Sequence, residues 1–242
     1  PATWLGKKLF RKNPSYFSAD GFEMNKRELV HFYQTEGFLS VKVEQPIIKV
    51  RGRKKKVELK IPVIEGEPIL IDSVKLRFAN NETFQQLITA HQTGKLGLLA
   101  HPAQRFRDDL VWNDRDQISR FLINRGYPYA IATPEITADT INKTANIIWD
   151  INRGPLGYFG PITVTGNIRT PEKLILRQLA FKEGDVYSRE KLNRSQQQVY
   201  QLGTFRVASL RAQLTRQQSD TIPVNIVINE APRTSTRVGV GY

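Results

Sequence analysis

Residues 158–230 decide the fold, and they read YFGPITVTGN (158–167), TPEKLILRQL (170–179), SREKLNRSQQQVYQL (188–202), FRVASLRAQL (205–214) and IPVNIVINE (222–230). The last stretch alternates apolar and other residues at period two, which predicts a strand with one buried face. The second and third stretches predict helices, with Thr170 and Ser188 as N-cap residues and Pro171 at the first helical position. The order strand, helix, helix, strand, strand predicts a small α+β module.

Two landmarks recur along the chain and show that this module is repeated. The first is a helix-like stretch that ends in a glycine before a strand, at Gly37, Gly126 and Gly203. The second lies 28 or 29 residues further on, at the end of a strand pattern, at Gly66, Gly154 and Ala231. Because both landmarks keep one register, the sequence predicts three tandem β-α-α-β-β modules in an elongated array.

Each module is expected to contain a strand with one buried face and a glycine that ends its second helix in the left-handed conformation. The expected buried faces are Val57, Leu59, Ile61 and Val63; Ala145, Ile147, Trp149 and Ile151; and Ile222, Val224, Ile226 and Ile228. Each three-stranded mixed sheet should place its last strand in the centre and carry two helices on one face. Residues 1–24 supply no convincing first strand, so the first module should be incomplete at its N-terminus.

The predicted boundaries are residues 1–67, 68–155 and 156–232 for the modules and 233–242 for a further segment. The open edges of such sheets present unpaired N–H and C=O groups, which can pair with another extended chain. The candidate docking edge is the hairpin strand of the third module, with Val207, Ala208, Ser209, Leu210 and Arg211. A proline at Ser209 is expected to impair docking while leaving the fold largely intact.

Composition limits the chemistry that the chain can perform. Cysteine is absent, which excludes disulfides, zinc-thiolate sites and thiol nucleophiles. Asp108, Asp109, Asp114 and Asp116 alternate with arginines on one predicted helix and favour i,i+4 surface pairs over an acid/base couple. We therefore expect no catalytic, metal or cofactor site, and no enzyme. No apolar run is long enough for a membrane helix, so an export signal would lie upstream or have been removed.

The formal net charge is +13, from 36 Lys and Arg against 23 Asp and Glu, which predicts attraction to an anionic partner. The densest basic run contains Arg51, Arg53, Lys54, Lys55 and Lys56. It lies between two strand patterns, which favours a solvated hairpin turn. The alternatives to a solvated turn are contact with anionic lipid and contact with nucleic acid.

The three modules, the junctions INRGYPYA and YQLGTF, and the strand ends TVTGN and NEAP resemble polypeptide-transport-associated (POTRA) modules. The segment RTSTRVGVGY that follows resembles the first barrel strand of the BamA/TamA outer-membrane assembly family, with Val238, Gly239, Val240, Gly241 and Tyr242 in that strand. Three modules and an arginine-rich middle helix look more like the TamA-type branch.

This resemblance implies an outer-membrane protein whose POTRA region lies in the periplasm and which uses no cofactor. It further implies binding to unfolded outer-membrane proteins, to accessory periplasmic proteins or lipoproteins, or to an inner-membrane TamB-like protein, and contact with outer-membrane lipid, without nucleic acid. Two alternatives stay open: the POTRA region of a two-partner-type secretion transporter, and a basic nucleic-acid-binding protein.

Overall fold

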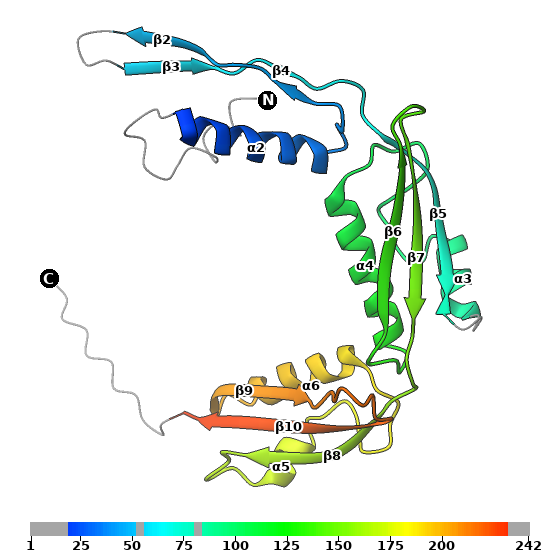
Figure 1. Cartoon of the computed structure of the whole chain (residues 1–242). Helices are drawn as coiled ribbons and strands as arrows, with labels where there is room; N and C mark the ends of the chain where they lie inside the picture. The colour runs from blue at the N-terminus through cyan, green and yellow to red at the C-terminus, as the bar shows by residue number, and fades with distance from the viewer. Residues whose placement is uncertain (1–18, 52–55, 80–83, 232–242) are drawn as a thin grey trace, which may run out of the picture. The chain divides into compact units, whose positions relative to one another are not determined.

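The structure, a computed structural model, describes residues 19–51, 56–79 and 84–231 (Figure 1). They form α and β elements in the order expected of tandem mixed modules, which confirms the predicted fold class. The chain divides into two compact units, whose division passes through the elements of the middle module. The first unit comprises the described parts of Pro1–Lys75, Leu98–Asp114 and Pro134–Trp149. The second unit comprises the described parts of Leu76–Gly97, Arg115–Thr133 and Asp150–Tyr242.

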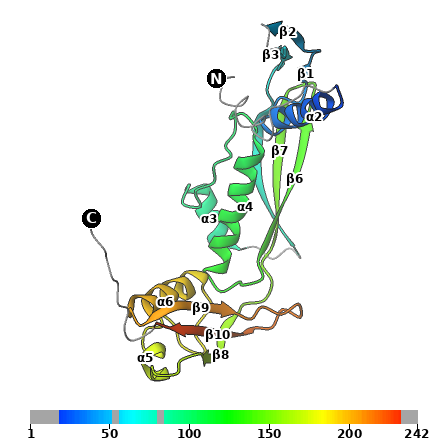
Figure 2. The same ribbon diagram turned by 90° about the vertical axis from the view of Figure 1, so that its left-hand side faces the viewer.

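The third module contains β8 (Tyr158–Thr165), α5 (Glu172–Leu176), α6 (Arg189–Gln201), β9 (Phe205–Ala212) and β10 (Thr221–Glu230) (Figure 2). Its strand order is β8-β10-β9, with β10 parallel to β8 and antiparallel to β9. The predicted central position of the last strand is confirmed. Ile222, Val224 and Ile226 on β10 are fully buried, as are Ile175 of α5 and Val199 of α6. Helices and sheet therefore share one apolar core.

The two predicted helix starts of this module have different outcomes. Ser188 is the N-cap of α6 and accepts a hydrogen bond from the Lys191 N–H, which confirms its predicted role. The prediction for Thr170 is wrong, because α5 begins at Glu172 and Pro171 is its N-cap residue, with no side-chain capping bond. The N–H of Thr170 instead donates to the Glu230 carboxylate at 2.8 Å. This tertiary bond holds Thr170 in the loop before the helix.

The middle module contains β5 (Leu70–Phe78), α3 (Gln85–Gln92), α4 (Asp108–Ile123), β6 (Ile131–Asp139) and β7 (Thr144–Asn152). Its strand order is β5-β7-β6, so the last strand is again central. The predicted buried face of β7 is confirmed, since its four apolar residues are at most 2% exposed: Ala145, Ile147, Trp149 and Ile151.

The prediction of surface ion pairs along α4 is wrong for Asp114, which is fully buried. Its carboxylate accepts hydrogen bonds from the N–H groups of Leu99 at 2.5 Å and Ala100 at 3.0 Å. Asp114 thus satisfies main-chain donors of the segment between the two helices. Asp109 and Asp116 pair with Arg107 and Arg115, two and one residues away in the sequence.

The first module contains α2 (Ala19–Thr35), β1 (Lys42–Val43), β2 (Ile47–Arg51), β3 (Lys56–Lys60) and β4 (Val63–Ile64). The two predicted strands pair as a hairpin, with β2 against β3 and β1 against β4. Pro46 and Pro62 lie where each strand is interrupted, since proline donates no ladder hydrogen bond. The pairing of Arg51 with Lys56 fits the predicted turn, whose residues 52–55 lie outside the described part of the chain.

The prediction of a buried face on the strand that begins at Val57 is wrong. Leu59 is exposed, and Ile61 and Val63 are only half-buried. The described core of this module instead contains Phe22 of α2 with Val41 and Val43. An apolar pattern of period two can therefore mark a strand whose apolar side chains are not covered by the described helix α2.

The helix-ending glycines adopt the predicted left-handed conformation. Gly37, Gly126 and Gly203 have φ of +90°, +95° and +71°. Only glycine adopts such angles without a steric penalty from Cβ. In residues 19–51, 56–79 and 84–231, no helix combines the length and apolar character that crossing a membrane requires.

Candidate docking edges

The residues proposed for docking lie on β9, an edge strand of the third sheet. Val207 is 50% exposed and Arg211 is exposed, whereas Ala208 and Leu210 point into the core. An incoming strand would therefore contact the side chains of one face and the main chain of the edge.

The hydrogen bonds next to β9 show which of its main-chain groups face outward. The N–H of Gln213 donates to the Pro223 carbonyl at 2.8 Å, so residue 213 faces β10. Because antiparallel partners alternate, Ser209, which is paired with Val227, also faces β10. Ala208, Leu210 and Ala212 then face away from the sheet. A proline at Ser209 would remove a ladder bond, so that substitution is wrong as a selective test of the edge.

Side chains already occupy part of both edges of the third sheet. On β9, the outward N–H of Leu210 donates to Gln196 Oε1 at 3.1 Å. On β8, the N–H of Ile162 donates to Glu183 Oε1 at 3.0 Å, and Phe159 exchanges backbone hydrogen bonds with residues 184 and 185. Sequence reasoning missed these acceptors, since no local pattern marks a helical glutamine that reaches a strand edge.

In the middle module, β6 is an edge strand of nine residues that lies mostly at the surface. Ile131 is 56% exposed and Ile136 is 42% exposed, while Ala132 is buried. Pro134 interrupts the row of N–H donors, a feature that is tolerated on edge strands. This edge was not among the residues that the sequence singled out.

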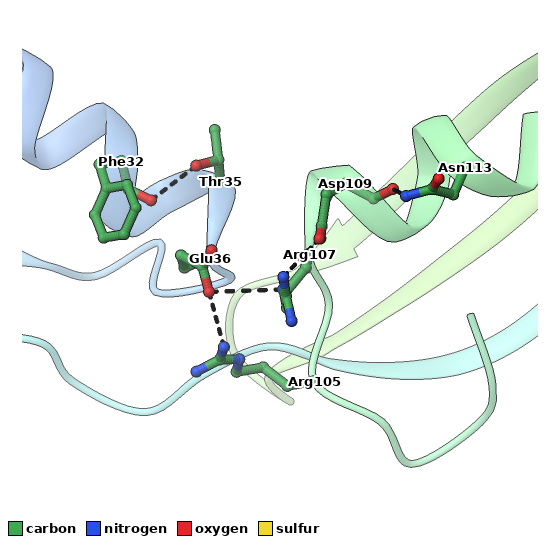
Figure 3. A network of polar contacts seen from close by, with 7 residues as sticks. All are labelled: Phe32, Thr35, Glu36, Arg105, Arg107, Asp109 and Asn113. Atoms are coloured by element: carbon green, nitrogen blue, oxygen red, sulfur yellow. Dashed lines mark hydrogen bonds and ion pairs between the residues drawn. The ribbon is translucent and has the colours of Figure 1, made fainter. Parts of the chain in front are cut away.

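A cluster of charged side chains in the first unit joins Glu36, just before Gly37, to Arg105 and Arg107, just before α4 (Figure 3). Arg105 Nη2 donates to Glu36 Oε2 at 2.8 Å, and Arg107 Nε lies 3.6 Å from the same oxygen. The Arg105 guanidinium also lies 5.3 Å from the centre of the Phe38 ring. These side chains are roughly one-third exposed, which predicts a modest contribution to stability from the ion pairs.

Backbone hydrogen bonds repeat at the two junctions between predicted modules. In the first unit, the N–H of Ile69 donates to the Gly37 carbonyl and the Ile69 carbonyl accepts from Phe106, both at 2.9 Å. The second unit repeats both bonds, at 2.7 and 2.9 Å, with Gly126, Gly157 and Tyr187. The glycine that ends each helix therefore also anchors the residue that opens the next module.

A carboxylate fixes the end of β10. Glu230 accepts hydrogen bonds from the Arg169 guanidinium at 2.8 Å and from the N–H groups of Arg169 and Thr170, and its side chain is 6% exposed. The Arg169 side chain, with smaller help from the two N–H groups, outweighs burial and lowers the pKa of Glu230 to about 2. Arg169 Nη2 also donates to the Ala231 carbonyl at 2.6 Å.

We expect Glu230→Gln to lower the Tm of the chain at pH 7. The folded pKa is depressed, so the ionised carboxylate contributes stability above its ordinary pKa of 4.5. That contribution is lost as pH falls from about 4.5 towards about 2, where the wild-type side chain becomes protonated. Thermal unfolding at pH 7, 4 and 2.5 should therefore show a difference between the two proteins that shrinks with acid. A difference independent of pH would contradict this assignment.

The other residues singled out from the sequence lie where side chains are not described. Val238, Gly239, Val240, Gly241 and Tyr242 fall outside the described residues. The side chains of the basic run from Arg51 to Lys56 do so as well.

Comparison with known families identifies the third module. The family model of POTRA, described as a surface antigen variable number repeat, matches residues 157–231. Residues 157–231 form a POTRA domain. The POTRA resemblance drawn from the sequence is thereby confirmed.

Relatives of the POTRA-containing chain are outer-membrane assembly factors. It is 24% identical over 247 residues to outer membrane protein assembly factor BamA of Neisseria meningitidis serogroup B, covering 99% of this chain and 29% of that protein. It is 23% identical over 232 residues to BamA of Buchnera aphidicola, covering 94% and 36%. The chain thus spans about a third of the length of the curated relatives it matches.

Solved structures show the same fold. The crystal structure of Haemophilus influenzae BamA POTRA3-5 has a TM-score of 0.59 and 19% identity, covering 90% of this chain and 83% of that chain. BamA from Haemophilus ducreyi lacking POTRA domains 1-3 has a TM-score of 0.55 and 19% identity, covering 67% and 29%.

These comparisons confirm the predicted location, since the BamA proteins that this chain resembles are outer-membrane proteins whose POTRA domains are periplasmic. Assignment to the TamA-type branch stays a prediction.

Proposed function

We propose that this POTRA region binds extended segments of unfolded outer-membrane proteins, or of partner proteins, by adding them as strands to its sheet edges. The observation that carries the proposal is the set of edge strands with outward main-chain groups, β9 in the third module and β6 in the middle one. Strand addition obtains affinity from main-chain hydrogen bonds and therefore tolerates many client sequences. That property suits a protein that handles unfolded chains.

The full protein, on this proposal, is an assembly or translocation factor of the outer membrane and this region is not an enzyme. Its partners are outer-membrane clients together with accessory periplasmic proteins, lipoproteins or an inner-membrane TamB-like protein. The curated relatives are named assembly factors, which supports this class. The net charge of +13 supports contact of the basic run at residues 51–56 with an anionic surface, and an outer-membrane protein meets anionic lipid rather than nucleic acid.

The proposed modules are residues 1–67, incomplete at the N-terminus, 68–155 and 156–232, and residues 233–242 begin the barrel. The repeated hydrogen bonds at Gly37 and Gly126 support the first two boundaries, because each links a helix end to a residue that opens the next module.

Strand addition is tested with two synthetic ten-residue peptides of alternating valine and threonine. One has an ordinary backbone, and the matched peptide carries N-methyl groups at every second residue, which remove the donors of one strand edge. We expect the ordinary peptide to slow amide hydrogen exchange in β6 or β9, and the methylated peptide to bind at least tenfold more weakly. Equal binding of both peptides would show that main-chain pairing is not the mechanism.

A short DNA duplex added to the same chain is the control for charge. Its binding should be weak and should decline steeply with salt, as for nonspecific attraction to phosphate. Tight binding that persists in salt would favour the nucleic-acid alternative.

A further inference from the structure

We propose that Gln196 gates the docking edge of the third module, whereas Ser119, at the corresponding helix position of the middle module, cannot act as such a gate. The inference rests on the proposed strand addition and specifies which edge is available to a client. Gln196 is exposed on α6, yet its Oε1 accepts the outward N–H of Leu210 at 3.1 Å. The side chain thus occupies the position that a carbonyl of an incoming strand would take.

The blocked donor lies in the middle of the edge. Among the outward positions of β9, Leu210 lies between Ala208 and Ala212, because alternate residues face β10. A strand that pairs with this edge must first displace the Gln196 amide or forgo the central hydrogen bond. Because Gln196 is exposed, the amide can rotate into water, so the gate raises the cost of docking without forbidding it.

The repeat supplies the comparison. Gln196 lies seven residues before Gly203, and the residue seven before Gly126 on α4 is Ser119. A serine hydroxyl is two bonds shorter than the glutamine carbonyl from the main chain, so it cannot reach across to the strand edge in the same way. Ser119 therefore supplies no gate of this kind to the middle module.

The strand positions also correspond. Ala208 and Leu210 are buried residues of β9. Their counterparts are Ala130, just before β6, and Ala132, within it. The register of β9 shifts by one residue between Val207 and Phe205, which accounts for the one-residue difference from the helix alignment. Pro134 lies two residues after Ala132 and so at an outward position, where a missing N–H costs no ladder bond. The edge around Ala132 is thus the counterpart of the edge around Leu210, with Ser119 in place of Gln196 on the helix.

The test exchanges the two residues, in Gln196→Ser and Ser119→Gln variants. Because the chain contains no cysteine, one cysteine introduced at a time reports each edge, through Arg211→Cys on β9 or Thr133→Cys on β6. Both replaced side chains are exposed. The probe is the valine-threonine peptide with one central cysteine, in a buffer of reduced and oxidised glutathione. Oxidised glutathione accepts the two electrons and two protons of the two thiols, and the readout is the yield of the mixed disulfide at equilibrium.

With Gln196 and Ser119 both unchanged, we expect the Thr133→Cys variant to crosslink more than the Arg211→Cys variant. Gln196→Ser should raise the yield at residue 211 by about threefold to tenfold, the range for one hydrogen bond, and leave residue 133 unchanged. Ser119→Gln should lower the yield at residue 133. Gln196→Glu, which keeps an acceptor oxygen, is the matched control and should keep residue 211 poorly reactive.

The outcomes separate this inference from the function on which it rests. Crosslinking at residue 211 that is the same with Gln, Ser and Glu at position 196 would overturn the gate while leaving strand addition intact. Crosslinking at neither edge in any variant would overturn strand addition itself. Circular dichroism of every variant checks that the fold is retained.

Discussion

Replacing Gly37 by alanine is expected to open the junction in the first unit and to cost about 2–4 kcal/mol. Two effects add. The φ of +90° is unfavourable for any residue with a Cβ, and a Cβ at this position would lie 2.4 Å from the Phe106 carbonyl oxygen. That oxygen belongs to the backbone and cannot rotate away as a side chain could. The Gly37 carbonyl, which accepts the Ile69 N–H, would be displaced with it.

Hydrogen exchange measures this effect locally, where global unfolding of several modules would blur it. The amides of Ile69 and Phe106 should exchange roughly 30- to 700-fold faster in the variant, which corresponds to the expected free energy. Amides of β10 should be unaffected.

Gly203→Ala is the matched control for the Gly37 substitution. Gly203 occupies the same helix-ending position with φ +71°, but within the described residues a Cβ there would meet nothing within 4 Å. Only the backbone penalty of about 1 kcal/mol should remain. If both variants changed exchange equally, the close approach to Phe106 would not be the cause.

Trp149→Ala is expected to destabilise the middle module by about 3–5 kcal/mol, because it removes the largest fully buried side chain from the centre of its sheet. Neighbouring side chains such as Ile147 and Ile151 lie on the same strand face and can collapse only partly into the space. Urea unfolding followed by far-ultraviolet circular dichroism should show an early transition for this module. In a protein of ordinary stability, this one substitution would remove much of the free energy of unfolding.

Trp149→Phe separates lost packing from lost hydrogen bonding. The indole Nε1 is buried and has no hydrogen-bond partner among the described residues, so phenylalanine removes a costly unpaired donor as well as some volume. Its cost should be below about 1.5 kcal/mol, as for hydrophobic substitutions of similar shape. A cost equal to that of alanine would indicate that the indole N–H is essential.

Much of the fold could be predicted from local sequence. The alternation through Ile147 and Trp149, the N-cap at Ser188 and the left-handed glycines act over a few residues, and all agree with the structure. Repetition of these signals gave the number and order of elements. By contrast, the expected N-cap at Thr170 failed because α5 begins at Glu172, and the loop before it is held by hydrogen bonds from Arg169 and Thr170 to Glu230, which is distant in sequence.

The candidate sites depended less on local pattern. Sequence placed Val207–Arg211 on an edge strand, but the direction of each main-chain group follows from the register with β10. The same limit explains Asp114, which resembles its surface neighbours in the sequence and yet lies buried against Leu99.

The sequence by itself determined the periodicity of the central strands β7 and β10 and the glycine helix ends, because each depends on residues close together along the chain. The threefold recurrence of one α+β module stays a prediction. Only the tertiary structure decided that Gln196 meets Leu210 and that Glu36 meets Arg105. The physical reason is that a hydrogen bond between distant residues depends on strand register and helix packing to within a fraction of an ångström, which no local pattern specifies.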